Sequence, residues 1–224
     1  MRNEKEAWDA TAEMLGHYSV TWSDHWSYNF RNDPKRLAFV LSRYKFAAKM
    51  GSKNRTILEL GCGEGIGSTI LGETAVSYTG VDLDDAAILA ARKNFNGSQF
   101  KFIYEDFMGK TFGAFQTVVS LDVVEHIYPQ HEALYFETLM MNLTQEGIAI
   151  VGTPNLTAAP YASKASQLGH VNLFSLSRLQ TTLERYFHNV FPFGMNDEIL
   201  HTGYAPMAHY ILCVACNRRS AWEN

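Results

Sequence analysis

Apolar and polar positions along residues 56–151 predict strands that alternate with helices. Short apolar runs, each the length of a buried parallel strand, fall at 56–60, 77–81, 100–104, 115–121 and 147–151. Between the second and third runs, residues 85–94 place Ala87, Ile88 and Ala91 on one helical face. This order predicts an α/β protein in which helices cover both faces of a mostly parallel sheet.

A further helix is predicted before the first strand, over residues 33–51. Its Asp-Pro start combines a favoured N-cap with a favoured first helical residue. The apolar stripe of this helix comprises Leu37, Val40, Leu41, Tyr44 and Ala48. Its basic residues lie elsewhere on the helical wheel, so we expect them to face solvent. The alternative is that Arg36, Arg43 or Lys45 contacts an anionic substrate.

The C-terminal third predicts a helix followed by two consecutive strands. Ser175 suits the N-cap of that helix, and the strands are expected at 188–193 and 209–216. Residues 194–208 join these strands and exceed the roughly 2–5 residues of a hairpin connection. We therefore expect this connection, like the long loop at 153–169, to form part of a functional site.

Residues 1–33 are rich in aromatic side chains but show neither helical nor strand periodicity. Three of the four tryptophans of the chain are here, and the aromatic set is Trp8, His17, Tyr18, Trp22, His25, Trp26, Tyr28 and Phe30. Such a segment could pack on the domain as an arm. It could also form a lid whose rings exclude water from a ligand.

The most informative stretch follows the first strand, where glycine occupies every second position at Gly61, Gly63 and Gly65. Glycine tolerates positive φ and lets a ligand lie against the backbone. The helix predicted next directs the positive end of its dipole at this turn. Asp82 ends the second strand, where a βαβ nucleotide site holds a ribose. A dinucleotide site would read G-x-G-x-x-G, whereas this turn reads G-x-G-x-G with Glu59 two residues before it.

Composition narrows the class of protein. The 224 residues are 46% hydrophobic, which suits one domain with a substantial core. The net charge of −4 gives no general attraction to nucleic acid, and no apolar run approaches the ~20 residues of a membrane span. No signal peptide is recognisable, so we expect a cytoplasmic protein. Cys213 and Cys216 lie in an apolar strand, and no further motif completes a metal site with them, so we expect no metal.

Further motifs follow the glycine turn in order: GVDLDD at 80–85, YEDF at 104–107 and SLDVVEHI at 120–127. With the turn, they resemble the class I S-adenosylmethionine-dependent methyltransferases. The TPN at 153–155 and the segment from His170 to Leu179 resemble the small-molecule group around the ubiquinone-biosynthesis O-methyltransferase. The resemblance covers about residues 50–216. It implies a Rossmann-like three-layer sandwich with a seven-stranded, mostly parallel sheet and an antiparallel strand seven.

The resemblance also implies a domain plan and a set of donor contacts. Residues 1–50 would be a cap of aromatic arm and helix, and residues 51–224 the methyltransferase domain, in a single domain overall. The donor would be S-adenosyl-L-methionine, and the product S-adenosyl-L-homocysteine. The implied contacts are Glu59, Gly61, Gly63 and Gly65 for its amino-acid end, Asp82 for the ribose, Leu83, Asp106 and Phe107 for the adenine, and Leu121 and His126 for the methionine part.

The acceptor site is expected among residues 1–33, 156–174 and 194–208. A hydroxyl acceptor benefits from a base, and histidine has a suitable pKa near ~6.5. His170 and His126 are the candidate bases, because they follow the fifth and fourth strands; His25, His201 and His209 are further candidates. The residues expected to contact the acceptor are Tyr18, Trp22, Trp26, Asn155, His170 and His201.

Several functions stay open on the sequence. We expect methyl transfer to an oxygen of a small molecule, but an N-methyltransferase or an enzyme acting on a phosphoryl or carboxyl oxygen without a base would have the same donor motifs. A nicotinamide-dependent oxidoreductase is disfavoured by the spacing of the glycines. A donor-binding module without catalysis is disfavoured by His126 and His170. The oligomeric state is not indicated.

Overall fold

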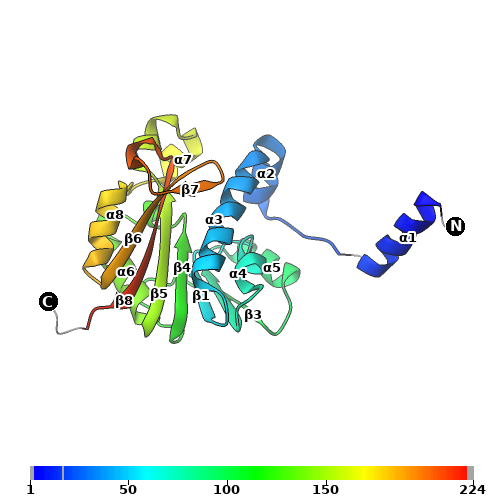
Figure 1. Cartoon of the computed structure of the whole chain (residues 1–224), viewed down its shortest axis with the longest axis horizontal. Helices are drawn as coiled ribbons and strands as arrows, with labels where there is room; N and C mark the ends of the chain where they lie inside the picture. The colour runs from blue at the N-terminus through cyan, green and yellow to red at the C-terminus, as the bar shows by residue number, and fades with distance from the viewer. Residues whose placement is uncertain (1–2, 17, 221–224) are drawn as a thin grey trace.

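A single twisted sheet forms the centre of the molecule in the computed structural model, which describes residues 3–16 and 18–220. The strand order is β3-β2-β1-β4-β5-β8-β6-β7 (Figure 1). The strands are β1 (Thr56–Leu60), β2 (Ser77–Asp82), β3 (Phe100–Tyr104), β4 (Phe115–Leu121), β5 (Leu143–Pro154), β6 (Phe187–Asn196), β7 (Ile199–His201) and β8 (Tyr210–Arg218).

Strands β1 to β5 are parallel, and β8 inserts antiparallel between β5 and β6. The predicted α/β class, the mostly parallel sheet and the antiparallel strand after the last helix are therefore confirmed. The number of strands differs, because the sheet in the described part of the chain has eight strands where seven were expected. The addition is β7, which forms at the sheet edge because the 194–208 connection turns back on β6 and pairs Gly194 with His201.

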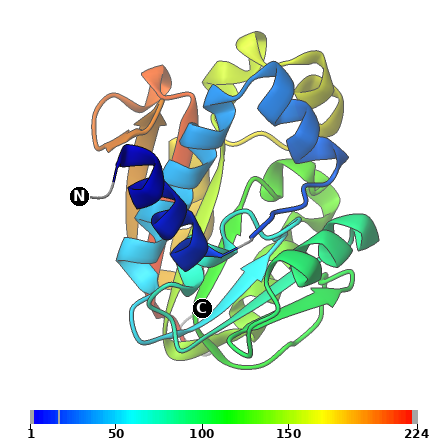
Figure 2. The same ribbon diagram turned by 90° about the vertical axis from the view of Figure 1, so that its right-hand side faces the viewer.

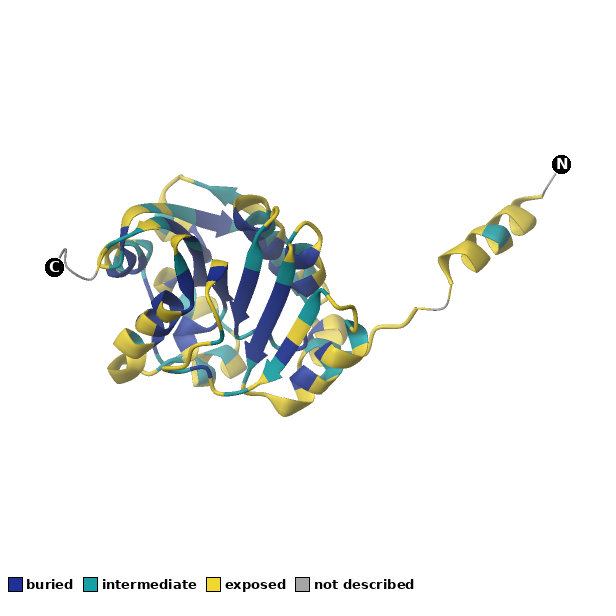
Figure 3. Ribbon diagram, turned by 90° about the horizontal axis from the view of Figure 1, so that it is seen from below, coloured by how far each residue is buried: buried dark blue, intermediate teal, exposed yellow. Residues whose placement is uncertain are grey.

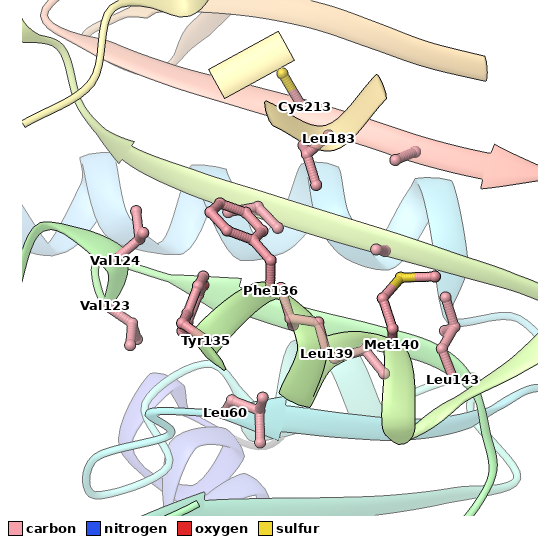
Figure 4. Close-up of a cluster of buried hydrophobic side chains, with 14 of the residues drawn as sticks. Leu60, Val123, Val124, Tyr135, Phe136, Leu139, Met140, Leu143, Leu183 and Cys213 are labelled. Atoms are coloured by element: carbon pink, nitrogen blue, oxygen red, sulfur yellow. The ribbon is translucent and has the colours of Figure 1, made fainter. Parts of the chain in front are cut away.

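Helices cover both faces of the sheet, which makes three layers. The main helices are α3 (Lys35–Gly51), α4 (Ser68–Gly72), α5 (Asp85–Asn94), α6 (Glu132–Met141) and α8 (Leu176–Glu184). Alternate side chains of each strand point to opposite faces, so Ile57 packs with α3, α4 and α5, whereas its neighbour Leu58 packs with α6 and α8. The α6 side contains Tyr135 and Phe136, which point toward the sheet (Figure 4).

The N-terminal segment forms two helices that its sequence did not predict, α1 (Glu4–Leu15) and α2 (Asp24–Asn32). Helix α1 begins with a capping box at Asn3 and Glu6, has no buried residue and projects from the rest of the described chain (Figures 1 and 3). Because all its faces meet solvent, no apolar stripe marks it. His17, grouped above with the aromatic residues, lies outside the described residues.

Helix α3 contributes to the hydrophobic core on one face of the sheet. Val40, Tyr44 and Ala47 are buried against β1, β4 and β5. Figure 2 shows α3 lying along one face of the sheet. The expectation that the basic residues of this helix face solvent is wrong for Arg43, which is also buried because Asp122 neutralises it. The proposed division at residue 50 therefore separates α3 from strands that it contacts.

The two long connections contain short helices. Residues 156–169, expected as a loop, hold η3 (Leu156–Tyr161) and α7 (Lys164–Gly169), and η4 (Ala205–Met207) precedes β8. Two further turns, η1 (Val124–His126) and η2 (Pro129–His131), lead from β4 into α6. Among the described residues, no helix is both long and apolar enough for a membrane span.

Candidate functional site

The glycine turn lies at the carboxyl end of β1, and each of its three glycines has positive φ: 79° at Gly61, 51° at Gly63 and 76° at Gly65. A Cβ at Gly61 would lie 2.2 Å from Cγ2 of Val123, so no side chain fits there. At Gly63, by contrast, nothing lies within 4 Å of the Cβ position. The turn is therefore packed against the protein at Gly61 and open at Gly63, as a ligand lying on the backbone requires.

Glu59 lies beneath this turn rather than facing it. The hydroxyl of Tyr44 donates a hydrogen bond of 2.7 Å to one carboxylate oxygen, and the hydroxyl of Tyr78 donates to the other. Burial raises the pKa of Glu59 to about 7, and the two tyrosine bonds act against this shift. Since both oxygens are occupied and the side chain is fully buried, Glu59 braces β1 against α3 and β2.

Asp82 connects the end of β2 to the open part of the turn. One of its oxygens accepts a 2.7 Å bond from the amide of Gly63, and the other accepts a 2.9 Å bond from the amide of Asp84. Each carboxylate oxygen can accept a second hydrogen bond, and the side chain is only half-buried. Asp82 thus shapes the turn while keeping capacity for two hydroxyl groups of a ligand.

The residues expected at the adenine lie at the ends of β2 and β3. Leu83 is 66% exposed, and Asp106 is exposed with one oxygen accepting a bond from the amide of Met108. Phe107 is buried in the core below them. Leu83 and Asp106 therefore present an apolar side chain and a carboxylate at this end of the sheet, whereas Phe107 belongs to the core and not to the surface.

A partly buried ion pair joins α3 to the end of β4. Nη1 of Arg43 lies 2.7 Å from Oδ2 of Asp122, and the guanidinium stacks 3.6 Å from the ring centroid of Tyr210. Asp122 has φ of 59°, which an aspartate adopts more readily than most residues. The helical wheel predicted a solvent-facing Arg43 or, as the alternative, a contact with an anionic substrate; neither prediction identified Asp122 as its partner.

Glu125, His126 and His170 converge just beyond this ion pair. One candidate ligand atom from each lies within 4.8 Å of the others, and the two imidazole centroids are 5.1 Å apart. The segment that carries His170 is held there because the amides of Val171 and Asn172 donate to the carbonyl oxygen of Glu125. These donor types could hold a metal ion, so the expected absence of a metal stays an expectation.

The protonation of this cluster follows from its surroundings. Burial, together with the charge of Asp122, raises the pKa of Glu125. Burial lowers the pKa of His170, and the neighbouring His126 lowers it further. Nδ1 of His126 lies 2.9 Å from the carbonyl oxygen of Gly169, which can only accept, so Nδ1 carries the proton and Nε2 is left as an acceptor.

A cavity of about 700 Å³ adjoins the cluster at the carboxyl ends of β4 and β5. Its polar wall includes Arg36, Arg43, Asp122, His170 and His209, together with polar residues of α7, and its apolar wall includes residues of α3 and η3. Asn155 also borders it, but its amide donates to the carbonyl oxygens of Ala205 and Ala208. The volume is within the range of small-molecule pockets.

The other residues expected at the acceptor are not gathered at this cavity. Tyr18 is 93% exposed. Trp22 borders a separate hollow between the N-terminal segment and α5, and Trp26 packs on the core. His201 is bonded through both ring nitrogens, to Asn196 and to the amide of Gly203. The cavity therefore brings together only Asn155 and His170 of the six residues expected.

One further buried acid was not anticipated. Glu64 lies between the second and third glycines of the turn and is 3% exposed. One carboxylate oxygen accepts a hydrogen bond from the amide of Ser23, the N-cap residue of α2, and the other has no partner in the described chain. The sequence does not mark this residue, because its partner Ser23 lies 41 residues away along the chain.

The fold, with the glycine turn at the end of β1, is that of a methyltransferase domain. The chain matches the family model described as a methyltransferase domain over residues 30–187, which is more than half of its length. It belongs to that family, and the resemblance to the class I S-adenosylmethionine-dependent methyltransferases is confirmed. The donor of this class is S-adenosylmethionine, as the sequence predicted.

Individual relatives are distant. Ubiquinone biosynthesis O-methyltransferase of Glaesserella parasuis serovar 5 (strain SH0165) is 24% identical over 138 residues, which cover 58% of this chain and 56% of that protein. The chain spans about half the length of the curated relatives it matches first.

Solved structures share the fold. Plantazolicin methyltransferase BpumL, in complex with a monoazolic desmethylPZN analog and SAH, has a TM-score of 0.62 at 17% identity, covering 87% of this chain and 89% of that one. N-methyltransferase NodS of Bradyrhizobium japonicum WM9 has a TM-score of 0.61 at 15% identity, with 84% and 99% covered.

Proposed function

We propose that this chain transfers a methyl group from S-adenosylmethionine to an oxygen of a small-molecule acceptor. The observation that carries the proposal is the place of the 700 Å³ cavity, whose wall includes both Asp122 and His170. An acceptor in this cavity would lie beside residues 121–126, where the methionine part of the donor is expected. Donor and acceptor would then meet at the carboxyl edge of the parallel strands, where open α/β sheets bind ligands.

The turn and its neighbours fit the donor. The open backbone at Gly63 leaves room for the amino-acid end of the donor, and Asp82 keeps hydrogen-bonding capacity for ribose hydroxyls. The donor supplies a methyl group that is already activated on a sulfonium. The remaining task of the protein is to align an acceptor atom with that methyl group and to exclude water.

His170 is the proposed base for a hydroxyl acceptor. Its lowered pKa keeps the imidazole neutral at neutral pH, and its ring borders the cavity. It can therefore take the proton that the hydroxyl loses as the new bond forms. His126 is the alternative base, because its Nε2 is free to accept a proton while its Nδ1 is bonded to Gly169.

A second candidate reaction is methylation of a carboxyl or phosphoryl oxygen. It is favoured by Arg36, which borders the cavity and has no ion-pair partner in the described chain. Such an acceptor is already ionised and needs no base. Methyl transfer to nitrogen is the third alternative, because NodS, with the same fold, is an N-methyltransferase.

The test is a transfer assay with isotopically labelled S-adenosylmethionine and matched sets of phenols, sugars, carboxylates, phosphates and amines, read by product mass. We expect turnover with hydroxyl acceptors, and none when NAD replaces the donor. Turnover restricted to amines or to carboxylates and phosphates would replace the proposed acceptor atom. Failure of S-adenosylhomocysteine to bind would contradict methyl transfer itself.

A further inference from the structure

Glu64 occupies an unusual position, because it joins the glycine turn to the first residues of α2. The amide of Ser23 donates to one of its oxygens, just before the nine-residue helix α2 begins at Asp24. The same segment is also held from α5, where Asn94 exchanges two hydrogen bonds of 2.8 Å with the backbone of Thr21. Helix α2 therefore starts at a fixed place beside the turn.

The second oxygen of Glu64 is shielded from solvent and has no hydrogen-bond partner among the described residues. A buried carboxylate oxygen without a partner is costly. No lysine or arginine among the described residues forms an ion pair with Glu64. His25 of α2 feels the charge of Glu64, but its pKa is lowered first by burial and then by Arg36, against the influence of Glu64 and Asp122. A neutral His25 does not balance the charge.

The open part of the turn is the residue before Glu64. No atom of the described chain lies within 4 Å of the Cβ position of Gly63. The other acid near the turn, Glu59, is fully buried, and Tyr44 and Tyr78 hold its carboxylate within the core. Glu64 is thus a buried acid with one unpartnered oxygen, and it follows the open backbone at Gly63 in the chain.

We propose that Glu64 binds the α-ammonium of the donor's methionine part while it holds the start of α2. This inference rests on the proposed function, because it takes S-adenosylmethionine as the donor. The ammonium supplies the positive charge and the hydrogen-bond donors that the second oxygen lacks. Since one carboxylate serves both partners, donor binding and the seating of α2 are linked, and each stabilises the other.

The test compares two ligands that differ in the ammonium. S-Adenosylhomocysteine carries the amino-acid group, whereas 5′-methylthioadenosine lacks it but retains the adenine, ribose and sulfur. Glu64→Gln keeps a carbonyl oxygen for the amide of Ser23 and removes the charge. We expect this variant to bind S-adenosylhomocysteine roughly tenfold or more weakly, as for one lost charge-assisted bond, and 5′-methylthioadenosine unchanged in calorimetric titration.

Two further variants complete the experiment. Glu73→Gln makes the same charge change at an exposed position at the end of α4 and should alter neither affinity. Glu64→Asp keeps the charge and should keep most of the preference for S-adenosylhomocysteine. Unchanged S-adenosylhomocysteine affinity in Glu64→Gln, or an equal loss for both ligands, would overturn the role of Glu64. If the unmodified protein bound neither ligand, the donor assignment itself would fail, and the inference with it.

Discussion

At the scale of single residues, substitution of Asp82 tests the proposed donor site most directly. Its carboxylate holds the amides of Gly63 and Asp84 and would also accept bonds from the two ribose hydroxyls. Because charge-assisted hydrogen bonds contribute roughly 1.5–3 kcal/mol each, Asp82→Ala should weaken S-adenosylhomocysteine binding at least tenfold. Titration calorimetry measures the affinity, and circular dichroism checks the fold.

Asp82→Asn serves as the matched variant. It retains one oxygen that can accept the amide of Gly63, so it should preserve the turn better than alanine while still losing the charge. A folded Asp82→Ala protein with unchanged affinity for the donor product would refute the ribose assignment.

His170 is the residue that tests the chemistry. General-base catalysis contributes ~10²–10⁴-fold, so His170→Ala should lower turnover by that order and leave donor affinity nearly unchanged. Its pKa lies below the usual histidine value because of burial and His126. The rate should therefore stay level at neutral pH and fall only under acidic conditions, where the imidazole gains a proton. Steady-state assays across pH measure both effects.

The exposed His131 provides the control for this experiment, since its removal changes a histidine away from the cavity. Loss of donor binding in proportion to activity would move His170 into the donor pocket. If neither changed, the base would be His126, or the acceptor would be ionised already.

Some residues of the site can be recognised from the sequence and others cannot. The turn glycines and Asp82 are recognisable because a ligand on the backbone requires glycine and because acids at strand ends have few other tasks. Arg43 and Glu64 were not recognisable, since what defines them is a partner far along the chain, Asp122 for one and Ser23 for the other. Helical periodicity cannot reveal that a buried arginine is neutralised.

At the scale of elements, the N-terminal helices differ in how they contact the rest of the molecule. Helix α1 has no buried residue, whereas α2 buries Asn29 and packs Trp26 on the core. Deleting residues 1–30 should leave the protein folded, because the sheet and α3 remain, but should abolish most turnover by opening the site to water. Deleting residues 1–15 alone should change little.

Circular dichroism and turnover assays on the two truncated proteins separate these roles. Full activity without residues 1–30 would show that α2 only packs on the domain. Loss of activity without residues 1–15 would give α1 a function that its exposure does not explain.

Elements with strong apolar patterns were predicted closely. The limits of β1, β3, β4 and α5 agree with the structure, since each places several side chains in the core. The elements that were missed, α1, α2, α7 and β7, are short or face solvent on most sides. Side-chain caps start α1 and α7, Glu64 and Asn94 hold the segment that leads into α2, and β7 pairs with β6. None of these contacts leaves a periodic signal in the sequence.

At the scale of the whole molecule, buried acids make stability depend on pH. The pKa of Glu59 is raised from 4.5 to about 7, so between these values the folded state holds a proton that the unfolded state has lost. The free energy of unfolding should therefore decrease as pH rises through this range, by up to ~1.4 kcal/mol per pKa unit. Glu125, whose pKa is also raised, acts in the same direction.

Urea unfolding at acidic and at mildly alkaline pH measures this dependence. Glu59→Gln removes the titrating group, so its free energy of unfolding should vary less with pH than that of the unmodified protein. An identical pH dependence in both proteins would show that Glu59 is ionised throughout and that the two tyrosine bonds outweigh its burial.

Helix α3 carries structural and cavity-facing residues on successive turns. Tyr44 and Arg43 hold the ends of β1 and β4, whereas Arg36 and Phe39, about one to two turns earlier, border the cavity. Substitutions at positions 36 and 39 therefore alter the shape and charge of the cavity without touching these anchors. Divergence toward new acceptors, in nature or by directed evolution, can proceed there with the donor machinery left intact.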